Sequence, residues 1–409
     1  MKITGVIAEY NPFHTGHKFQ LEHIRKNGGA DYCIVVMSSD FVQRGTPAVL
    51  PKHLRTRTAL ESGADLVLEL PTAFCTASAE GFARGGVSLL NALGVVTSLS
   101  FGCETQNMSL FMETARILAE EPKEYRDMLK TGLQKGLSFP AARSEALLWH
   151  FASQPADAVS LSERKEFLSQ PNNILGIEYC KALLGLHSSI VPEPLLRRGS
   201  AYHSLDWEKT SHPSASSLRE LLRQPEAFCR LTDPVYRSLR DAAAGNFCLF
   251  PEDFDLLFHY RLLTETAGHL AGYLDFPLPL ANRVIHCRNQ YTTLEDFCSL
   301  LKTKELTHTG IRRSLLHMLL EITEIPRSVP YARILGFRKS AAPLLTAIKQ
   351  NSSVPLVTKL ADASRYLDCE AQKILQETTD ASNIYESVLC RKAGRPFVHE
   401  YQKEVILVP

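Results

Sequence analysis

The chain has 409 residues, of which 44% are hydrophobic, and its 45 basic and 44 acidic side chains leave a net charge of +1. This length predicts two or three domains with a large core, and the near-neutral charge excludes a global basic field, so any nucleic-acid partner must be held by a local patch. The sequence shows no signal peptide and no apolar run of the ~18 residues that span a bilayer, so we expect a cytoplasmic protein. The 10 cysteines lack zinc spacing, and we expect reduced thiols and no metal centre built from side chains.

The first 105 residues alternate between predicted strands and predicted helices. Strands are expected at 3–8, 31–37, 64–70 and 98–102, and helices at 17–26, 52–62 and 78–93. The second strand is a nearly continuous apolar run, which is typical of a buried parallel strand. This alternation predicts an α/β fold with a doubly wound parallel sheet, in which ligands bind beyond the carboxyl ends of the strands.

The turn after the first strand carries the most informative motif, which ends in His14-Thr15-Gly16-His17 and runs into a helix. The first N–H groups of a helix lack intrahelical acceptors and attract phosphate. His14 and His17 lie on one helical turn, and Gly16 allows a ligand to approach the backbone. Imidazole N–H groups can stabilise charge on phosphoryl oxygens. The pattern resembles the HIGH signature of nucleotidyltransferases, so we predict that His14 and His17 are catalytic and that Lys18 holds a phosphate.

Polar side chains also follow the second predicted strand. Asp40, Gln43 and Arg44 either reach the same crevice or belong to a solvated loop. Lys52 and Arg55 on the next helix are either phosphate ligands or part of a solvated face.

Three later positions suit a nucleotide. Gly102 ends the fourth strand and permits close backbone approach, although a simple turn would also use glycine. Asn172 and Asn173 precede a helix that is expected near residue 174, where they are either ligands or cap and turn residues. Arg197, at the end of a short predicted strand (189–191), suits an anion contact or a surface ion pair.

A second phosphate motif begins at Ser214. Ser214, Ser216 and Arg219 open a short predicted helix, which suits either a phosphate site or an ordinary N-cap. We expect this motif and the His14–His17 turn to complete one site, with one near the α-phosphate and the other near the β- and γ-phosphates.

Two long stretches are predicted to be mostly helical. The first, 106–170, is interpreted as an inserted segment with helices at 110–119, 125–136 and 139–151. In the second, 224–409, helices are expected at 256–274, 293–301, 311–322, 341–349 and 356–382. Segment 303–339 carries a net charge of about +4 and predicts either an RNA-binding surface or a solvated face, with Arg312, Arg313, Arg333 and Arg338 as candidate contacts.

Four motifs together resemble one family. They are Tyr10-Asn11-Pro12-Phe13-His14-Thr15-Gly16-His17, Phe41-Val42-Gln43-Arg44-Gly45, Pro171-Asn172-Asn173-Ile174-Leu175-Gly176 and Ile334-Leu335-Gly336-Phe337. In type and order they are similar to motifs of the bacterial tRNA(Met) cytidine acetate ligases, and the resemblance covers essentially the whole chain. It implies an enzyme that makes acetyl-adenylate from ATP and acetate and then acetylates the exocyclic amine of the wobble cytidine in elongator tRNA(Met).

The resemblance also implies an ATP site at residues 7–20, Gly102, Asn172 and Arg197. Asn172 and Arg197 are preferred to their neighbours because they fit the family's spacing to the downstream Gly-x-x-Tyr-His at 199–203. The chain has Thr15, Ser39 and His53 where the family usually has Asn, Gly and Trp. Together with the two helix-start motifs, the predicted ATP-binding set is Ile7, Ala8, Glu9, Tyr10, Asn11, Pro12, Phe13, His14, Thr15, Gly16, His17, Lys18, Phe19, Gln20, Gly102, Asn172, Arg197, Ser214, Ser216 and Arg219.

We therefore predict an ATP and acetate activation domain at 1–222, with the helical insertion at about 106–170, and a helical tRNA-binding domain at 223–409. Mg²⁺ is expected to accompany ATP, and the expected partners are acetate and elongator tRNA(Met), with no membrane and no DNA. Asp40, Gln43, Arg44, Lys52 and Arg55, with the four arginines of 303–339, are the candidate contacts for acetate or tRNA. The alternatives are a small-molecule adenylyltransferase that makes a dinucleotide cofactor and a non-catalytic RNA-binding protein.

Overall fold

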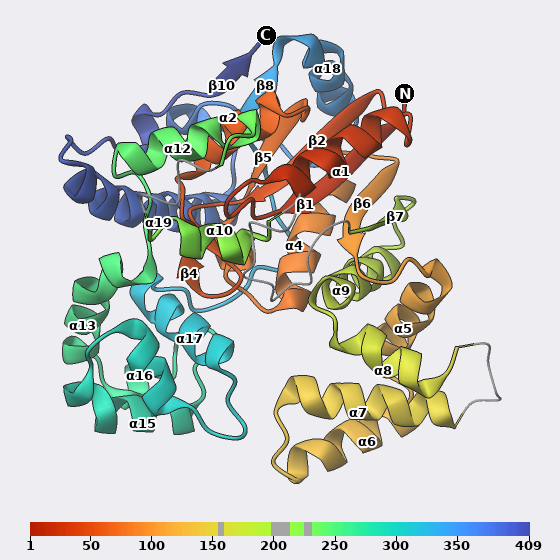
Figure 1. Ribbon diagram of the computed structural model, residues 1–409, viewed down its shortest axis with the longest axis vertical. Helices are drawn as coiled ribbons and strands as arrows, with labels where there is room; N and C mark the ends of the chain where they lie inside the picture. The colour runs from red at the N-terminus through yellow and green to blue at the C-terminus, as the bar shows by residue number, and fades with distance from the viewer. Residues whose placement is uncertain (154–158, 198–212, 225–230) are drawn as a thin grey trace.

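The computed structural model describes residues 1–153, 159–197, 213–224 and 231–409. Its centre is an eight-stranded sheet in the order β10-β8-β5-β2-β1-β6-β7, with β9 beside β8 (Figure 1). The strands are β1 (Ile3–Ala8), β2 (Tyr32–Ser38), β5 (Leu66–Leu70), β6 (Ser98–Cys103), β7 (Val191–Leu196), β8 (Ala332–Arg338), β9 (Leu356–Val357) and β10 (Ile406–Val408). Among these described strands only the β5–β8 pair is antiparallel. The predicted doubly wound α/β sheet is confirmed.

Helices cover both faces of the sheet because side chains alternate along each strand. On β2, Cys33, Val35 and Met37 pack toward the helices on one face, whereas Ile34 and Val36 pack toward those on the other. The first face carries α1 (Thr15–Lys26), α2 (Lys52–Glu61), α10 (Ala215–Leu221) and α12 (Arg237–Ala244). The second carries α4 (Ala79–Ala92), α5 (Met108–Glu120), α9 (Pro171–Gly185) and α18 (Ala342–Asn351), and the short α3 (Thr72–Cys75) packs beside α4.

Two helical lobes extend below the sheet in Figure 1. The insertion lobe contains α6 (Lys123–Gln134), α7 (Phe139–Ala152) and α8 (Leu161–Ser169), close to the helices expected there. The second lobe contains α13 (Asp255–Thr264), α14 (Ala267–Leu270), α15 (Leu278–Cys287), α16 (Leu294–Leu301) and α17 (His308–Leu320). It has a separate hydrophobic core, to which Tyr385 and Leu389 of the long helix α19 (Cys369–Ala393) contribute. No helix in the described ranges is both long and apolar enough to cross a membrane.

The structure corrects three expected elements. The helix predicted at 356–382 is wrong at its start, because Leu356 and Val357 pair with β8 and α19 begins only at Cys369. The helix predicted at 256–274 is broken, because Thr266 accepts a hydrogen bond from the N–H of His269 and starts α14 as a new helix. The strand expected at 189–191 lies further along the chain, because β7 spans Val191–Leu196.

The division at residue 222 stays a prediction, but the central sheet crosses it. Strands β8, β9 and β10 come from the C-terminal half and pair into the sheet of the N-terminal half. The C-terminal half is therefore mostly helical without being a separate helical body.

Candidate active site

A cleft of about 590 Å³ lies beyond the carboxyl ends of β1, β6 and β7. This is the edge of a doubly wound sheet where ligands bind. Residues from both halves of the chain line it: the end of β1 and the turn that follows, Gly102 after β6, Asn172 on α9, Arg197 after β7, Ser214 to Ser216 and Arg219 around α10, and Arg312 on α17. The two predicted helix-start motifs, about 200 residues apart in sequence, thus lie in one cleft.

His14 and His17 form the floor of the cleft at the N-terminus of α1. Their rings stack with centroids 3.7 Å apart and an interplanar angle of 22°. Nδ1 of His14 accepts a hydrogen bond from the N–H of Gly16 at 3.0 Å, and Nδ1 of His17 accepts one from the N–H of His14 at 3.3 Å. A neutral imidazole that accepts at Nδ1 carries its proton on Nε2. The turn therefore fixes both Nε2 atoms as donors.

His17 is held in its neutral form. Burial lowers its pKa well below the ordinary value, and the nearby His14 and Arg197 lower it further. A neutral donor at a helix N-terminus can hydrogen-bond a phosphoryl oxygen without first losing or gaining a proton.

Gly102, Asn172 and Arg197 form one wall of the cleft. Nη1 of Arg197 donates to Oδ1 of Asn172 at 3.1 Å, and Nδ2 of Asn172 donates to the carboxylate of Glu104. A Cβ added to Gly102 would lie in ordinary contact with Arg197, 3.4 Å from its Cγ, so the stem of the arginine packs over the strand end. These contacts hold both polar side chains at the cleft surface.

The neighbouring Asn173 has a different role. It is fully buried, and its Oδ1 accepts hydrogen bonds from the N–H groups of Glu104 and Thr105 at 3.0 and 3.2 Å. Neither asparagine is the N-cap of α9, because that position is Gln170. Asn173 therefore shapes the loop that carries Glu104, whereas Asn172 lines the cleft.

Arg219 ties the second motif to the first. Its Nη1 donates to the carbonyl of Asn11 at 2.6 Å, and its Nη2 donates to Oγ of Ser216 at 3.1 Å. Ser214 is the N-cap of α10 and accepts a hydrogen bond from the N–H of Ser217 at 3.1 Å. The guanidinium therefore bridges the N-terminal turn and α10 inside the cleft.

Most of the predicted ATP-binding residues line the cleft. They are Ile7, Ala8, Glu9, Tyr10, Asn11, His14, Gly16, His17, Phe19, Gln20, Gly102, Asn172, Arg197, Ser214, Ser216 and Arg219, and Gln43, Arg44 and Arg312 join them from the predicted acetate and tRNA contacts. Pro12, Phe13, Thr15 and Lys18 are not among the lining residues. Phe13 packs into the core, and the Thr15 hydroxyl lies 3.4 Å from that of Tyr236. The role of Lys18 stays a prediction, and the motif at 199–203 lies outside the described residues.

The structure corrects the expectation for Arg55, which is fully buried and faces no ligand. Its guanidinium donates to the carbonyls of Leu50, Glu9 and Ser38 at 2.9, 2.6 and 3.1 Å, and to that of Ser39. It therefore joins the carboxyl ends of β1 and β2 and holds the floor of the site together.

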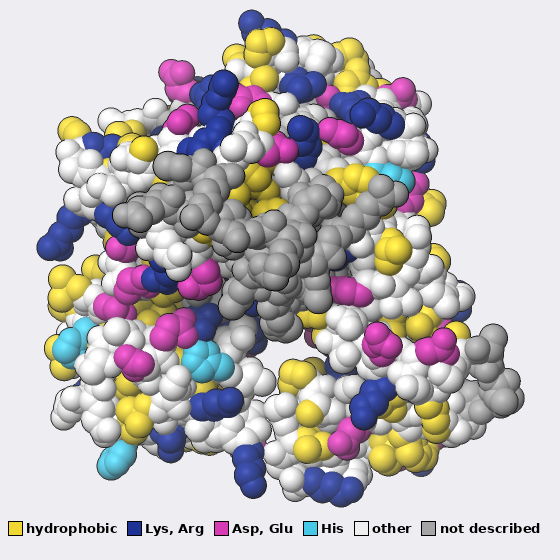
Figure 2. Space-filling model, in the orientation of Figure 1, with side chains coloured by type: hydrophobic (Ala, Val, Ile, Leu, Met, Phe, Trp, Pro, Cys, Tyr) yellow, Lys and Arg dark blue, Asp and Glu magenta, His cyan; other side chains and the backbone are white. Residues whose placement is uncertain are grey.

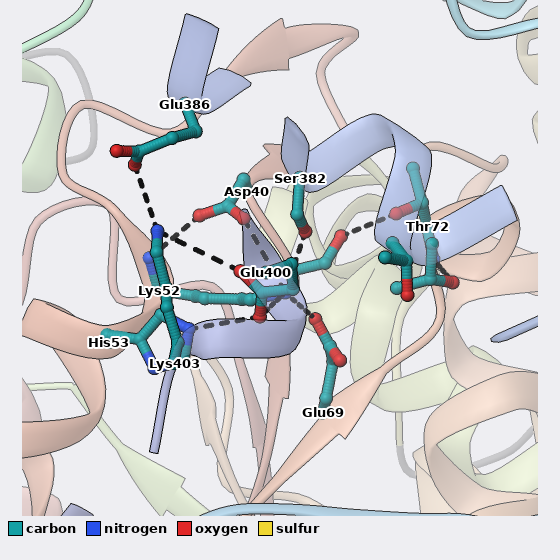
Figure 3. Close-up of polar contacts among 12 residues, drawn as sticks. Asp40, Lys52, His53, Glu69, Thr72, Ser382, Glu386, Glu400 and Lys403 are labelled. Atoms are coloured by element: carbon teal, nitrogen blue, oxygen red, sulfur yellow. Dashed lines mark hydrogen bonds and ion pairs between the residues drawn. The ribbon is translucent and has the colours of Figure 1, made fainter. Parts of the chain in front are cut away.

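The structure also places Asp40, Lys52 and Arg333 inside the protein. Figure 3 shows the polar contacts around Asp40, Lys52 and Glu400. Nζ of Lys52 lies 2.5 Å from the carboxylate of Glu69 and 2.9 Å from that of Glu400. The backbone N–H of Lys52 donates a hydrogen bond to Oδ1 of Asp40 at 2.8 Å. Arg333 donates to Glu69 at 2.5 Å and to Glu400 at 2.6 Å. We call Asp40, Lys52, Glu69, Arg333 and Glu400 the buried ion cluster. These side chains have no access to a substrate, so the expectation that they contact one is wrong.

Burial opposes the charged form of Glu400, but the attraction of Lys52, His53 and Arg333 outweighs it and lowers the pKa of the carboxyl strongly. The carboxyl of Glu400 therefore remains charged around neutral pH.

Two further predicted contacts lie away from the cleft. Arg313 Nε lies 3.3 Å from Asp275, and Arg338 donates to the carbonyl of Leu60 at 3.0 Å. Arg223, Phe250 and Glu295 are among the cleft residues that sequence reasoning missed. Each lies in the C-terminal half without a local motif, so only the folded chain brings it to the site.

No group of three or more His, Cys, Asp or Glu side chains in the described ranges is placed to hold a metal ion. Glu9, Glu220 and Glu295 are the carboxylates among the described cleft residues.

Comparisons with known proteins show the class of protein to which this site belongs. The family described as HIGH Nucleotidyl Transferase matches residues 1–396, a range that includes the stacked His14 and His17 at the start of α1. Two tRNA(Met) cytidine acetate ligases are each 37% identical: that of Clostridium tetani over 91% of this chain and 94% of its own, and that of Acetivibrio thermocellus over 97% and 98%. The chain therefore belongs to the tRNA(Met) cytidine acetate ligase family, a family of ligases.

Solved structures agree with this assignment. The apo form of Thermotoga maritima TmcAL is 31% identical and superimposes with a TM-score of 0.93 over 100% of both chains. The form of the same protein bound with alpha-thio ATP has a TM-score of 0.89, at 31% identity, over 100% of this chain and 99% of that chain.

Proposed function

We propose that this cleft binds ATP and acetate, forms acetyl-adenylate, and transfers the acetyl group to the wobble cytidine amine of elongator tRNA(Met) in the cytoplasm. The observation that carries the proposal is the stacked pair of histidines at a helix N-terminus within a cleft that Arg197 and Arg219 also line. The names of the relatives and the alpha-thio ATP in the T. maritima protein support it.

In the first step, a carboxylate oxygen of acetate attacks the α-phosphorus of ATP. The bond to the bridging oxygen breaks and pyrophosphate leaves, so no proton is transferred. Negative charge on the α-phosphoryl oxygens would be stabilised by Nε2–H of His14 and His17 and by the N-terminus of α1. Arg219 and Ser216, which are hydrogen-bonded to each other, would hold the phosphate chain, with Lys18 as a further candidate.

In the second step, the cytidine amine nitrogen attacks the carbonyl carbon of acetyl-adenylate. The bond from that carbon to the phosphate oxygen breaks, AMP leaves, and the amine nitrogen releases one proton to water. The same histidines would then stabilise the negative charge that returns to the phosphate of AMP.

Mg²⁺ fits this cleft as an ion that arrives with the triphosphate. Magnesium in nucleotide sites is usually held by phosphates, waters and one or two carboxylates, and Glu9 is a cleft carboxylate beside the turn. The ion would neutralise phosphate charge.

ATP–pyrophosphate exchange with and without acetate, followed by transfer of labelled acetate to bulk tRNA, tests the proposal. We expect exchange only with acetate, and label in tRNA only when ATP is also present. Acetate-independent exchange would favour an adenylyltransferase of small molecules, and a lack of any exchange would favour a non-catalytic RNA-binding protein.

A matched pair of variants tests the role of the histidines. His17→Ala should slow acetate-dependent exchange on the order of 10²–10³-fold, because it removes one transition-state donor. His23→Ala is the control, since His23 lies on the same helix but does not line the cleft. Near-full exchange by well-folded His17→Ala protein would refute the assignment.

A further inference from the structure

A short hairpin carries Arg44 to the cleft and rests on the second helical lobe. The hairpin consists of β3 (Phe41–Val42) and β4 (Thr46–Pro47), and β4 packs against α17 (Figure 1). Gly45 has a φ of +75°, and a Cβ there would lie 2.7 Å from the backbone N of Arg313 and 2.9 Å from the carbonyl carbon of Arg312. Only glycine permits both this turn and this approach. The hairpin turn therefore sits directly on the backbone beside Arg312.

This contact between the hairpin turn and α17 brings two arginines that are far apart in sequence to the same cleft. Arg44 and Arg312 both line the cleft. The pKa of the Arg219 guanidinium is lowered, first by burial, and the charges of Arg44 and Arg312 lower it further. The three guanidiniums therefore lie within electrostatic range of one another.

The cleft is richer in cations than the chain as a whole. Its described lining residues include five arginines, Arg44, Arg197, Arg219, Arg223 and Arg312, against Glu9, Glu220 and Glu295. Arg312 is partly neutralised, because its Nη2 donates to Glu295 at 2.6 Å. Guanidinium groups gathered in this way suit the planar, bidentate recognition of phosphate oxygens.

Arg44 and Arg312 approach from the side of the second helical lobe, whereas Arg219 lies at the N-terminal turn where we place the phosphate chain of ATP. Figure 2 shows a gap between that lobe and the insertion lobe, below the sheet. A folded RNA needs such an open approach, and a nucleoside triphosphate does not. Single-stranded RNA loops are bound through their phosphates while their bases are splayed into a site.

We propose that Arg44 and Arg312 form a phosphodiester site for the tRNA, next to the nucleotide whose amine is acetylated. The proposal rests on the proposed function and deepens it, because it separates a tRNA phosphate site from the ATP phosphate site. A phosphate of tRNA and a phosphate of ATP present the same chemistry to an arginine. The two sources are therefore distinguished by measuring acetate-dependent exchange, which needs ATP but no tRNA, separately from acetyl transfer, which needs tRNA.

The test compares Arg44→Gln and Arg312→Gln with Arg313→Gln, which removes the neighbouring charge on the same helix but outside the cleft. For each purified protein we would measure acetate-dependent exchange, the KM for tRNA in acetylation, and direct tRNA binding over a range of salt. Each cleft variant should weaken tRNA binding on the order of tenfold or more, since it loses a charged hydrogen bond. The slope of log affinity against log salt should fall by about 0.7–0.9 for each lost contact.

The decisive result is the split between the two half-reactions. We expect the loss in the tRNA step to exceed the loss in exchange at least about tenfold, and Arg44→Lys to recover part of the affinity because it keeps the charge. Equal losses in exchange and in tRNA binding would overturn the proposal and assign these arginines to ATP. Cleft variants that bind tRNA like Arg313→Gln, with the wild-type salt slope, would overturn it too.

Failure of the proposed function gives a different result. In that case wild-type protein would show no acetate-dependent exchange, while direct tRNA binding would still report on Arg44 and Arg312. Thermal unfolding followed by circular dichroism shows whether each variant is folded, and Arg44→Gln leaves the backbone seat of the hairpin intact even if Arg312→Gln disturbs it.

Discussion

Replacing Arg333 with methionine should destabilise the protein strongly, although Arg333 lies outside the cleft. Its guanidinium is about 5% exposed and contacts the carboxylates of Glu69 and Glu400, which are about 1% exposed. Methionine fills a similar volume but carries no charge. The variant would therefore bury three carboxylates, those of Asp40, Glu69 and Glu400, with Lys52 as the cation fully enclosed with them.

The expected loss follows from what remains in the interior. Removing one partner of a buried ion pair costs about 3–5 kcal/mol, because the other charge is left uncompensated. Arg333 contacts two carboxylates, but Lys52 also contacts both. We therefore expect the loss of free energy of unfolding to lie within this range rather than to be twice as large. Glu400→Gln combined with Arg333→Met should cost less than the sum of the two single changes, since the double variant removes both members of one pair.

Urea unfolding followed by circular dichroism at pH 7 measures this effect. Arg327→Met is the control, because Arg327 is exposed on the segment before β8, and it should change the free energy of unfolding by at most about 0.5 kcal/mol. A loss below about 1 kcal/mol for Arg333→Met would show that the buried ion cluster does not need this charge, contrary to the expected loss of about 3–5 kcal/mol.

The dependence on pH gives a second check. The folded-state pKa of Glu400 is lowered, so its contribution is complete above the unfolded-state value of about 4.3 and is lost as the pH falls below it. The difference between wild type and Arg333→Met should therefore be constant from pH 7 to about 5 and shrink in more acidic solution. A difference that grows on acidification would contradict this account.

Three further outcomes are expected. Gly45→Ala should raise the KM for tRNA and lower the melting temperature, because its Cβ would collide with the backbone of Arg313; unchanged values of both would refute the seat described for the hairpin. The rate of acetate-dependent exchange should stay level from about pH 8 to 6.5, because the lowered pKa keeps His17 neutral there, and an inflection near 6.5 that is absent in His17→Ala would contradict this. Asn173→Ala should lower the free energy of unfolding by about 1–3 kcal/mol, whereas Asn172→Ala should mainly raise the KM for ATP. Calorimetry and exchange kinetics measure the two effects, and a stable Asn173→Ala with a raised KM for ATP would contradict these roles.

The sequence was most informative where a site is built from neighbouring residues. The turn from β1 to α1 was predicted with its two histidines because strand, glycine and helix start follow one another along the chain. The doubly wound sheet was predicted for a related reason, since apolar strands alternate with amphipathic helices over the first 105 residues. The family resemblance placed Asn172 and Arg197, which do line the cleft.

Charge alone misled where burial decides the role of a side chain. The sequence offers Lys52, Arg55 and Arg333 either as ligands for phosphate or RNA or as part of a solvated face, but each is enclosed and hydrogen-bonded to acceptors of the protein. These acceptors are spread over the whole chain. The carboxylate of Glu400, for example, contacts both Lys52 and Arg333, although it lies far from Lys52 in sequence.

Neighbouring residues alone indicate the local chemistry: a phosphate-binding turn after the first strand, a second helix-start motif at Ser214, and an α/β sheet to carry them. The folded chain is needed to see which charges face the cleft and which are buried beneath it. It also shows that β8, β9 and β10 complete the sheet and that Arg44 meets Arg312. The physical reason is that strand pairing, ion pairing and the closing of a cleft join residues hundreds of positions apart, and no local pattern records such partners.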